Sequence, residues 1–189
     1  MKRILSLTVI IISAMIYLTG CGNNGNSTTA VPAESTATVS TSLKHPVKVL
    51  VLCTGNTCRS QMAHGFFSSF DKNLQVYSGG VEPAEKINPK AVEVMAELGI
   101  DISDHTPHDV REYLDEKWDY VITVCDHAHE TCPVFNGEVV SQMHIGFDDP
   151  SHATGTPEFI DSEYHRVRDE IGTRMRALYE FMLTDQNNK

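Results

Sequence analysis

Cys53 and Arg59, separated by five residues, form a pair that can act on a tetrahedral oxyanion. A cysteine thiolate is a strong nucleophile, and the planar guanidinium of arginine can hold two anion oxygens at once. Gly55 is expected to let the backbone bend close to such a ligand. The predicted oxyanion-binding and thiolate-stabilising residues are Thr54, Gly55, Asn56, Thr57, Cys58 and Ser60.

The residues on either side of this segment predict a strand before it and a helix after it. Residues 47–52 form an almost unbroken run of Val and Leu, which indicates a buried strand, and a helix is expected to follow Ser60. A tight loop between a strand and a helix N-terminus gathers several backbone N–H groups around one point. The same positive field is expected to favour the Cys53 thiolate.

Strands and helices alternate along the rest of the chain. Further strands are predicted at 74–78, 119–124 and 139–145, with a helix starting at Asn88-Pro89 and a long helix after Thr156-Pro157. This order predicts an α/β fold, a three-layer sandwich with a four-stranded parallel sheet and helices on both faces. Ligands of such sheets bind at the carboxyl ends of the strands.

A second pair of cysteines, Cys125 and Cys132, follows the strand predicted at 119–124. The two could be inert buried thiols, or they could bind zinc together with His127 and His129. They could also form a disulfide after a local rearrangement. We favour the redox interpretation, because Cys125 should lie at the same sheet edge as Cys53.

Two acidic residues, Asp148 and Asp149, follow the last predicted strand. A thiolate that attacks a tetrahedral oxyanion expels an oxygen, and this leaving group needs a proton. Either carboxyl group could supply it, and the alternative is a solvated turn before Pro150.

The N-terminal region resembles that of an exported protein. Residues 1–21 combine Lys2 and Arg3 with an apolar run, and Leu18-Thr19-Gly20-Cys21 resembles the lipobox of bacterial lipoproteins, in which Cys21 would be lipidated. An uncleaved membrane anchor is the alternative. Residues 22–45 are rich in Ser, Thr and Asn and are expected to be a disordered tether, which leaves a domain over 46–189.

The formal charge of the whole chain is -10. Because the first 45 residues carry a small positive charge, the predicted domain is more acidic still. A domain of this charge is a poor candidate for binding nucleic acid.

Several motifs together resemble the thioredoxin-coupled arsenate reductases, which share the fold of the low-molecular-weight protein tyrosine phosphatases. The resemblance covers the chain from about Val47 to the last helix. The motifs that carry it are the segments 53–63, 77–80, 88–91, 101–103, 125–133, 146–150 and 166–171.

The resemblance implies roles for individual residues. Cys53 would be the nucleophile, Arg59 the oxyanion clamp and Asp149 the general acid, and Ser60 would stabilise the Cys53 thiolate. A Cys53–Cys125 disulfide would form during arsenate reduction, and exchange with Cys132 would then leave a Cys125–Cys132 disulfide. Cys58 would stay outside this relay.

The resemblance also implies a reduced thioredoxin-like protein as electron donor, arsenate as substrate, and no metal, flavin or nucleotide. A monomer is expected. A phosphatase acting on phosphate monoesters is the closest alternative, and it would need only Cys53, Arg59 and Asp149. A non-enzymatic, tethered oxyanion- or metal-binding lipoprotein is the other.

Two features depart from that family. Some members bind potassium near the loop through Asn, Glu, Ser and Asp; Asn56 and Ser78 match, but His64 and His108 stand at the acidic positions. Imidazoles are poor ligands for a hard alkali cation, so we predict no potassium site. The lipoprotein-type signal is the second departure. It predicts a membrane-anchored, periplasm-facing protein with a dedicated donor there, or a cytoplasmic one if the signal is not used.

Overall fold

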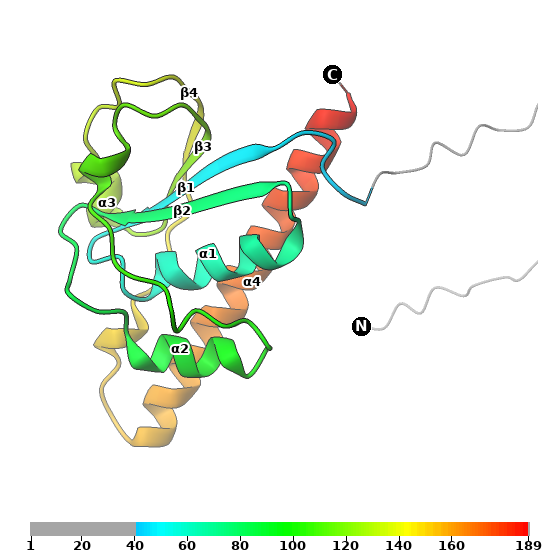
Figure 1. The fold of residues 1–189 in the computed structure, drawn as a ribbon. Coiled ribbons are helices and arrows are strands. Elements are labelled where there is room, and N and C mark those ends of the chain that lie inside the picture. Colours follow the sequence, from blue (N-terminus) through cyan, green and yellow to red (C-terminus); the bar gives the residue numbers. More distant parts are fainter. Residues whose placement is uncertain (1–40, 189) are drawn as a thin grey trace, which may run out of the picture. The chain divides into compact units, whose positions relative to one another are not determined.

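The computed structural model describes residues 41–188, which fold into alternating strands and helices around one sheet (Figure 1). Two short 3-10 helices, η1 and η2, complete the set. The elements in chain order are β1 (Val47–Cys53), α1 (Arg59–Phe70), β2 (Leu74–Gly80), α2 (Pro89–Ala96), η1 (Val110–Tyr113), β3 (Trp118–Thr123), α3 (Asp126–Thr131), β4 (Val139–His144), η2 (Pro150–His152) and α4 (Pro157–Asn187).

The four strands form a parallel sheet in the order β2-β1-β3-β4, which confirms the predicted α/β class. β1 lies in the interior of the sheet, between β2 and β3, and its last residue, Cys53, pairs in register with Gly80 at the end of β2. The carboxyl ends of these strands therefore meet at one edge, where Figure 1 also places α3. This is the edge at which a parallel sheet binds ligands.

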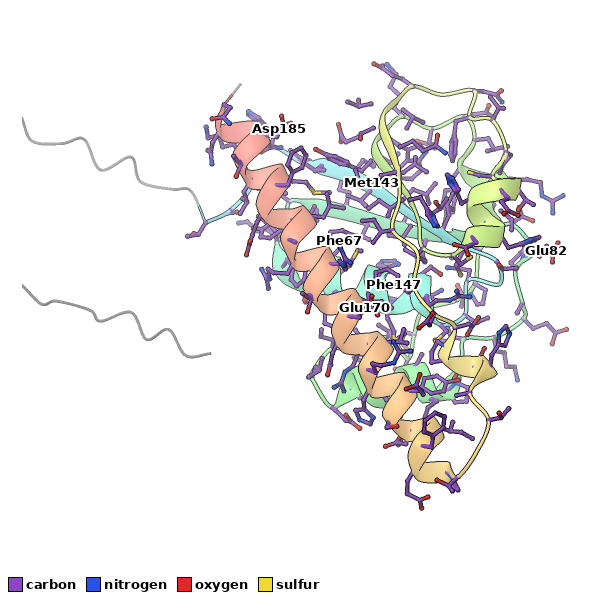
Figure 2. The ribbon with its side chains drawn as sticks, turned by 180° about the vertical axis from the view of Figure 1, so that it is seen from behind. Phe67, Glu82, Met143, Phe147, Glu170 and Asp185 are labelled. Carbon is purple, nitrogen blue, oxygen red and sulfur yellow. The ribbon has the colours of Figure 1, made fainter. Side chains whose placement is uncertain are left out.

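Alternate residues of β1 serve two different cores. Val49 and Val51 pack on the side of α1, α2 and α4, whereas Leu50 and Leu52 pack on the opposite side against Val110 of η1 and its neighbours. All four of these β1 side chains are fully buried, which explains why the strand reads as a continuous apolar run. Figure 2 shows α4 crossing the molecule on the first of these sides, with Phe67 of α1 beside it.

Helices α2 and α4 begin where the sequence predicts. The Asn88 side chain accepts hydrogen bonds from the N–H groups of Lys90 and Ala91, and Pro89 occupies the first helical position. Thr156 caps α4 in the same way, through the N–H of Phe159. After α2 the chain turns at Gly99, whose φ of 72° lies in the left-handed region that glycine tolerates.

The structure places residues 41–45, predicted as part of the tether, against the domain itself. The Asp71 carboxylate accepts hydrogen bonds from the Leu43 N–H (2.7 Å) and the Tyr179 hydroxyl (2.9 Å). The side chain of Leu43 is buried, and the Gln186 side chain receives the N–H groups of Lys44 and His45. The packed region therefore begins before the predicted boundary at Pro46.

Residues 1–40, which contain the predicted signal peptide, Cys21 and most of the tether, lie outside the described residues. Among residues 41–188, no helix is long and apolar enough to cross a membrane.

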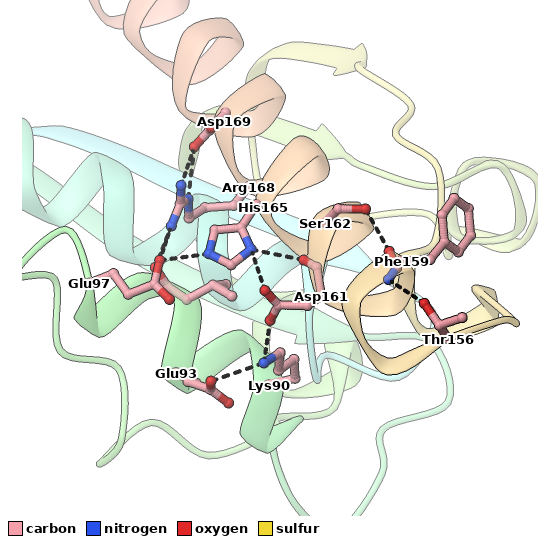
Figure 3. A network of polar contacts seen from close by, with 11 residues as sticks. Lys90, Glu93, Glu97, Thr156, Phe159, Asp161, Ser162, His165, Arg168 and Asp169 are labelled. Carbon is pink, nitrogen blue, oxygen red and sulfur yellow. Dashed lines mark hydrogen bonds and ion pairs between the residues drawn. The ribbon is translucent and has the colours of Figure 1, made fainter.

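A network of charged side chains joins α2 to α4 (Figure 3). Arg168 donates to the Val94 carbonyl (2.9 Å) and to the Glu97 carboxylate (2.8 Å), and its side chain is almost fully buried. Glu97 also accepts from the Nε2 of His165 at 2.7 Å. The segment that leads into α2 contacts the predicted anion loop, because the Asn88 N–H donates to the Thr57 carbonyl at 2.9 Å. The network that joins α2 to α4 is therefore connected to the predicted anion loop through the start of α2.

Replacing Arg168 with alanine should destabilise the fold by about 2–4 kcal/mol, because it leaves the buried Val94 carbonyl without this donor and removes a charge partner of Glu97. Urea unfolding followed by circular dichroism measures this loss. Arg166→Ala is the matched control, since Arg166 forms half-exposed ion pairs of the kind worth less than about 1 kcal/mol. Equal losses in the two variants would contradict the assigned role of Arg168.

Candidate active site

Residues 54–58 form a tight loop between the end of β1 and the start of α1. The segment after β2 holds the carbonyl groups of this loop: Glu82 N–H donates to Thr54 O (2.9 Å) and Ala84 N–H to Gly55 O (3.0 Å). With the carbonyl groups engaged on this side, the loop N–H groups are the donors available to an anion. The sequence predicted this loop, and the structure places it at the carboxyl edge of the sheet.

The sequence suggested that the loop bends at Gly55, but the structure places the bend at Asn56. Asn56 has a φ of 51°, and it is the one non-glycine residue with positive φ among the described residues. A Cβ added to Gly55 would meet Thr57 at an ordinary 3.6 Å, whereas one added to Gly80 would lie 2.6 Å from the Thr54 carbonyl oxygen. The glycine that this loop requires for close approach is therefore Gly80, on the neighbouring strand.

Buried polar contacts fix Asn56 in this conformation. Its side chain donates to Ser60 Oγ (2.9 Å) and accepts from the His108 N–H (2.8 Å). Its carbonyl accepts from Gln61 Nε2 at 3.0 Å, and Gln61 Oε1 in turn lies 2.9 Å from His105 Nδ1. The roles of Gln61 and His105 were not predicted from the sequence. The available clue was a polar residue among the buried positions of the first turn of α1.

The sulfur of Cys53 lies within this network. Sγ is 2.9 Å from Ser60 Oγ and accepts the Asn56 N–H at 3.1 Å. Burial raises the pKa of the Cys53 thiol, and the nearby Cys125 adds to this, whereas the hydrogen bonds from Ser60 and Asn56 oppose it. The net direction is upward, because burial outweighs these hydrogen bonds, whereas the sequence led us to expect a field that favours the thiolate.

Arg59 and Asp149 face each other across the mouth of the loop. Arg59 Nη2 lies 2.5 Å from Asp149 Oδ2, and Nη1 donates to the Phe147 carbonyl at 3.0 Å. Asp149 also caps η2, because it accepts from the Ser151 N–H at 3.0 Å. Asp148 instead pairs with Arg166 on the surface. Of the two candidate acids, only Asp149 contacts the predicted oxyanion clamp.

Cys125 lies beside the anion loop, at the N-terminal end of α3. Its Sγ is 3.3 Å from Thr54 Oγ1, and its side chain is buried. Cys125 and Cys53 line the same cavity of about 460 Å³, together with Arg59 and Asp149. The structure thus brings together the two thiols that the sequence assigned to one sheet edge.

Cys132 lies at the far end of α3 and does not line this cavity. It is half-buried and packs against the second core, around Trp118 and Val121. The four cysteines between 41 and 188 are all free thiols in this structure. A disulfide between Cys125 and Cys132 therefore requires α3 to change its conformation.

Cys58, at the end of the loop, is a buried thiol of a different kind. Burial raises its pKa to about 12, and Asp149 and Cys53 contribute in the same direction against an opposing effect of Arg59. At neutral pH such a thiol is protonated, which agrees with its expected place outside the relay.

The histidines near Cys125 have separate neighbours. His127 lies 3.6 Å from a carboxylate oxygen of Glu82, whereas His129 stacks on His144. Residues 41–188 contain no group of three or more His, Cys, Asp or Glu side chains arranged to hold a metal ion. The zinc interpretation of this segment thus finds no support in the geometry.

Asn56, His64, Ser78 and His108 stand at the positions considered above for a potassium site. His64 Nδ1 lies 3.2 Å from Ser78 Oγ, and the His108 backbone is bonded to Asn56. The His64 ring also packs against that of His105, with centroids 4.5 Å apart. Burial and the neighbouring His105 and His108 lower the pKa of His64 to about 4, so its ring is neutral at neutral pH. The absence of a potassium site remains a prediction.

The low pKa of His64 predicts a loss of stability in mild acid. The unfolded chain binds a proton near pH 6.5 and the folded one near pH 4, so stability falls as the pH drops through this window. Between pH 7 and pH 5 this amounts to about 2 kcal/mol. In His64→Gln the difference between the unfolding free energies at these two pH values should shrink by that amount. The exposed His152→Gln serves as control, and an unchanged difference in His64→Gln would contradict the assignment.

A buried thiol on a tight loop, faced by an arginine and an acid at the edge of a parallel sheet, is the arrangement expected of an enzyme that acts on oxyanions through a cysteine. Residues 48–188 match the family described as low molecular weight phosphotyrosine protein phosphatase. The chain belongs to this family.

Several similar proteins within this family are arsenate reductases. The chain is 44% identical over 133 residues to an arsenate reductase of Halalkalibacterium halodurans, and the match spans 70% of this chain and 94% of that one. A solved structure described as an arsenate reductase in the phosphate binding state shares 27% identity with a TM-score of 0.60, over 72% of this chain and 98% of that one. The thioredoxin-dependent arsenate reductase of Corynebacterium glutamicum shares 25% identity with a TM-score of 0.55, over 75% of this chain and 63% of that one.

Proposed function

We propose that this protein reduces arsenate to arsenite through three cysteines, Cys53, Cys125 and Cys132, with a thioredoxin-like protein as electron donor. The observation that carries the proposal is the position of Cys125, whose sulfur lies 3.3 Å from Thr54 of the anion loop and lines the cavity of Cys53. A phosphatase has no use for a second thiol at this position. The similarity to arsenate reductases supports the same substrate.

The first step is the formation of an adduct on Cys53. Arsenate binds the loop N–H groups and Arg59, where it competes with Asp149 for the guanidinium. The Cys53 thiolate attacks arsenic, and the departing hydroxide takes a proton from Asp149 and leaves as water. Arsenic remains As(V), now bound through sulfur to Cys53.

The second step transfers two electrons. The Cys125 thiolate attacks the sulfur of Cys53, a Cys53–Cys125 disulfide forms, and the sulfur–arsenic bond breaks with its electron pair on arsenic. Arsenic is reduced to As(III) and leaves as arsenite.

The last steps regenerate Cys53. The Cys132 thiolate attacks Cys125, which frees Cys53 and leaves a Cys125–Cys132 disulfide. A reduced thioredoxin-like protein then supplies two electrons and two protons to that disulfide. A thioredoxin-dependent relative of the same fold supports this choice of donor.

Arsenate turnover with thioredoxin, thioredoxin reductase and NADPH tests this proposal in wild type, Cys125→Ser and Cys132→Ser. Both variants should lose sustained turnover. Hydrolysis of p-nitrophenyl phosphate, measured in parallel, separates the functions, because a phosphatase needs neither thiol. Full thioredoxin-dependent turnover in both variants would overturn the relay.

The proposal extends to the location of the protein. Lipidation at Cys21 would anchor the protein to a membrane, with the domain facing the periplasm. The lipobox-like segment Leu18-Thr19-Gly20-Cys21 supports this location. Mass spectrometry of the mature N-terminus tests it, with a diacylated Cys21 as the expected result. An intact Met1 on a protein in the soluble cytosolic fraction would remove the basis for the anchor.

A further inference from the structure

Helix α3 separates the two cysteines that the proposed relay must join. Cys125 and Cys132 are seven residue steps apart, which in a helix of 1.5 Å rise places their Cα atoms about 10 Å apart. A disulfide bridges Cα atoms no more than about 7 Å apart. Part of α3 must therefore unwind before Cys132 can reach Cys125.

The first turn of α3 rests on His144, the last residue of β4. The rings of His129 and His144 are stacked, with centroids 4.4 Å apart and an angle of 26° between their planes. The His129 N–H bonds to the Cys125 carbonyl at 3.1 Å, so His129 closes the turn that starts at Cys125. His129 therefore joins the stack through its side chain, while its backbone N–H binds the carbonyl of Cys125, the N-cap of α3.

His144 is itself held on the sheet. Its Nδ1 lies 2.9 Å from Oγ1 of Thr123, a fully buried residue of the neighbouring strand β3. Its Nε2 lies 3.2 Å from Asp126 Oδ1, which adds a second contact to α3. The backbone of Gly146 packs closely against the His144 ring, since a Cβ added to Gly146 would lie 2.9 Å from His144 Nε2. The ring is thus a fixed support against which the helix can pack.

We propose that His144 is a positioning residue for the disulfide exchange: it stabilises the helical, reduced form of α3 and so sets the reduction potential of the Cys125–Cys132 pair. This inference rests on the proposed relay. When Cys132 attacks Cys125, one disulfide replaces another and Cys53 leaves as a thiolate, with no net change in electrons. The first turn loses its contacts with His144 as α3 unwinds, which opposes the exchange and favours return of the helix after reduction.

The matched variants are His129→Gln and His127→Gln, which make the same substitution on the same helix. Only His129 belongs to the stack, whereas the half-exposed His127 faces Glu82 at 3.6 Å. Both are made in full-length Cys53→Ser protein. This substitution removes the thiol that competes with Cys132 for a disulfide with Cys125. Each is equilibrated in a series of dithiothreitol redox buffers, in which the disulfide takes two electrons and two protons from one reduced dithiothreitol.

Alkylation of free thiols and peptide mass spectrometry measure the oxidised fraction. Loss of the stack should shift the equilibrium toward the disulfide about fivefold, since an aromatic contact of this kind changes an equilibrium constant by about that factor. The reduction potential of the pair should then become roughly 20 mV more negative. His144→Gln should shift it the same way, and His127→Gln should leave it unchanged. Unchanged potentials in His129→Gln and His144→Gln would overturn the role of His144 and leave the relay standing. Failure of the parent protein to form a Cys125–Cys132 disulfide would overturn both proposals.

Discussion

Replacing Cys53 with serine should abolish arsenate reduction, with a fall in turnover of at least about 10⁴-fold. A serine hydroxyl is not ionised near neutral pH, and it cannot form the sulfur–arsenic bond or the later disulfide with Cys125. The smaller oxygen still has Ser60 Oγ and the Asn56 N–H as hydrogen-bond partners, so the loop should keep its shape. Steady-state turnover with the thioredoxin system measures the loss.

Arsenate binding to Cys53→Ser, followed by calorimetry, is the control for this result. The loop N–H groups and Arg59 remain in this variant. The dissociation constant for arsenate should therefore stay close to that of wild-type protein with an unmodified, protonated Cys53. Residual turnover within tenfold of wild type would show that Cys53 is not the nucleophile.

Replacing Asp149 with asparagine should lower kcat by about 10²–10⁴-fold, the usual contribution of a general acid. Asparagine can still accept a hydrogen bond from Arg59, but it cannot protonate the departing hydroxide. Asp148→Asn is the matched control one residue away. Its carboxylate is largely exposed and pairs with Arg166, so that variant should react nearly as fast as wild type.

The two aspartate variants also decide between the acids that the sequence left open. A large loss in Asp148→Asn together with a small one in Asp149→Asn would reverse the assignment. Equal losses would point to a structural effect of the turn before Pro150.

The sequence predicted most of the framework because the relevant signals are local. The apolar run of β1, the cap at Asn88 and the cysteine–arginine spacing each lie within a few residues, and the structure confirms the elements they predict. Alternation of strands and helices was enough to place Cys53 and Cys125 at one edge of the sheet, where both line one cavity.

The features that sequence analysis missed depend on contacts between distant segments. Gly80 matters because β2 approaches the Thr54 carbonyl, and nothing adjacent to Gly80 in the sequence reveals this approach. Leu43 is held by Asp71 and packs in the core, although its polar neighbours indicated a tether. For the six residues of α3 the sequence left open a short helical turn or a loop, since a segment this short has weak helical propensity of its own.

The most direct test of the three-cysteine relay is a rapid-quench measurement on Cys132→Ser with excess arsenate. Without Cys132 the first disulfide cannot be passed on, so each protein molecule should release one arsenite and then stop. Mass spectrometry of the quenched protein should show a Cys53–Cys125 disulfide. Sustained turnover, or release of arsenite without that disulfide, would contradict the account.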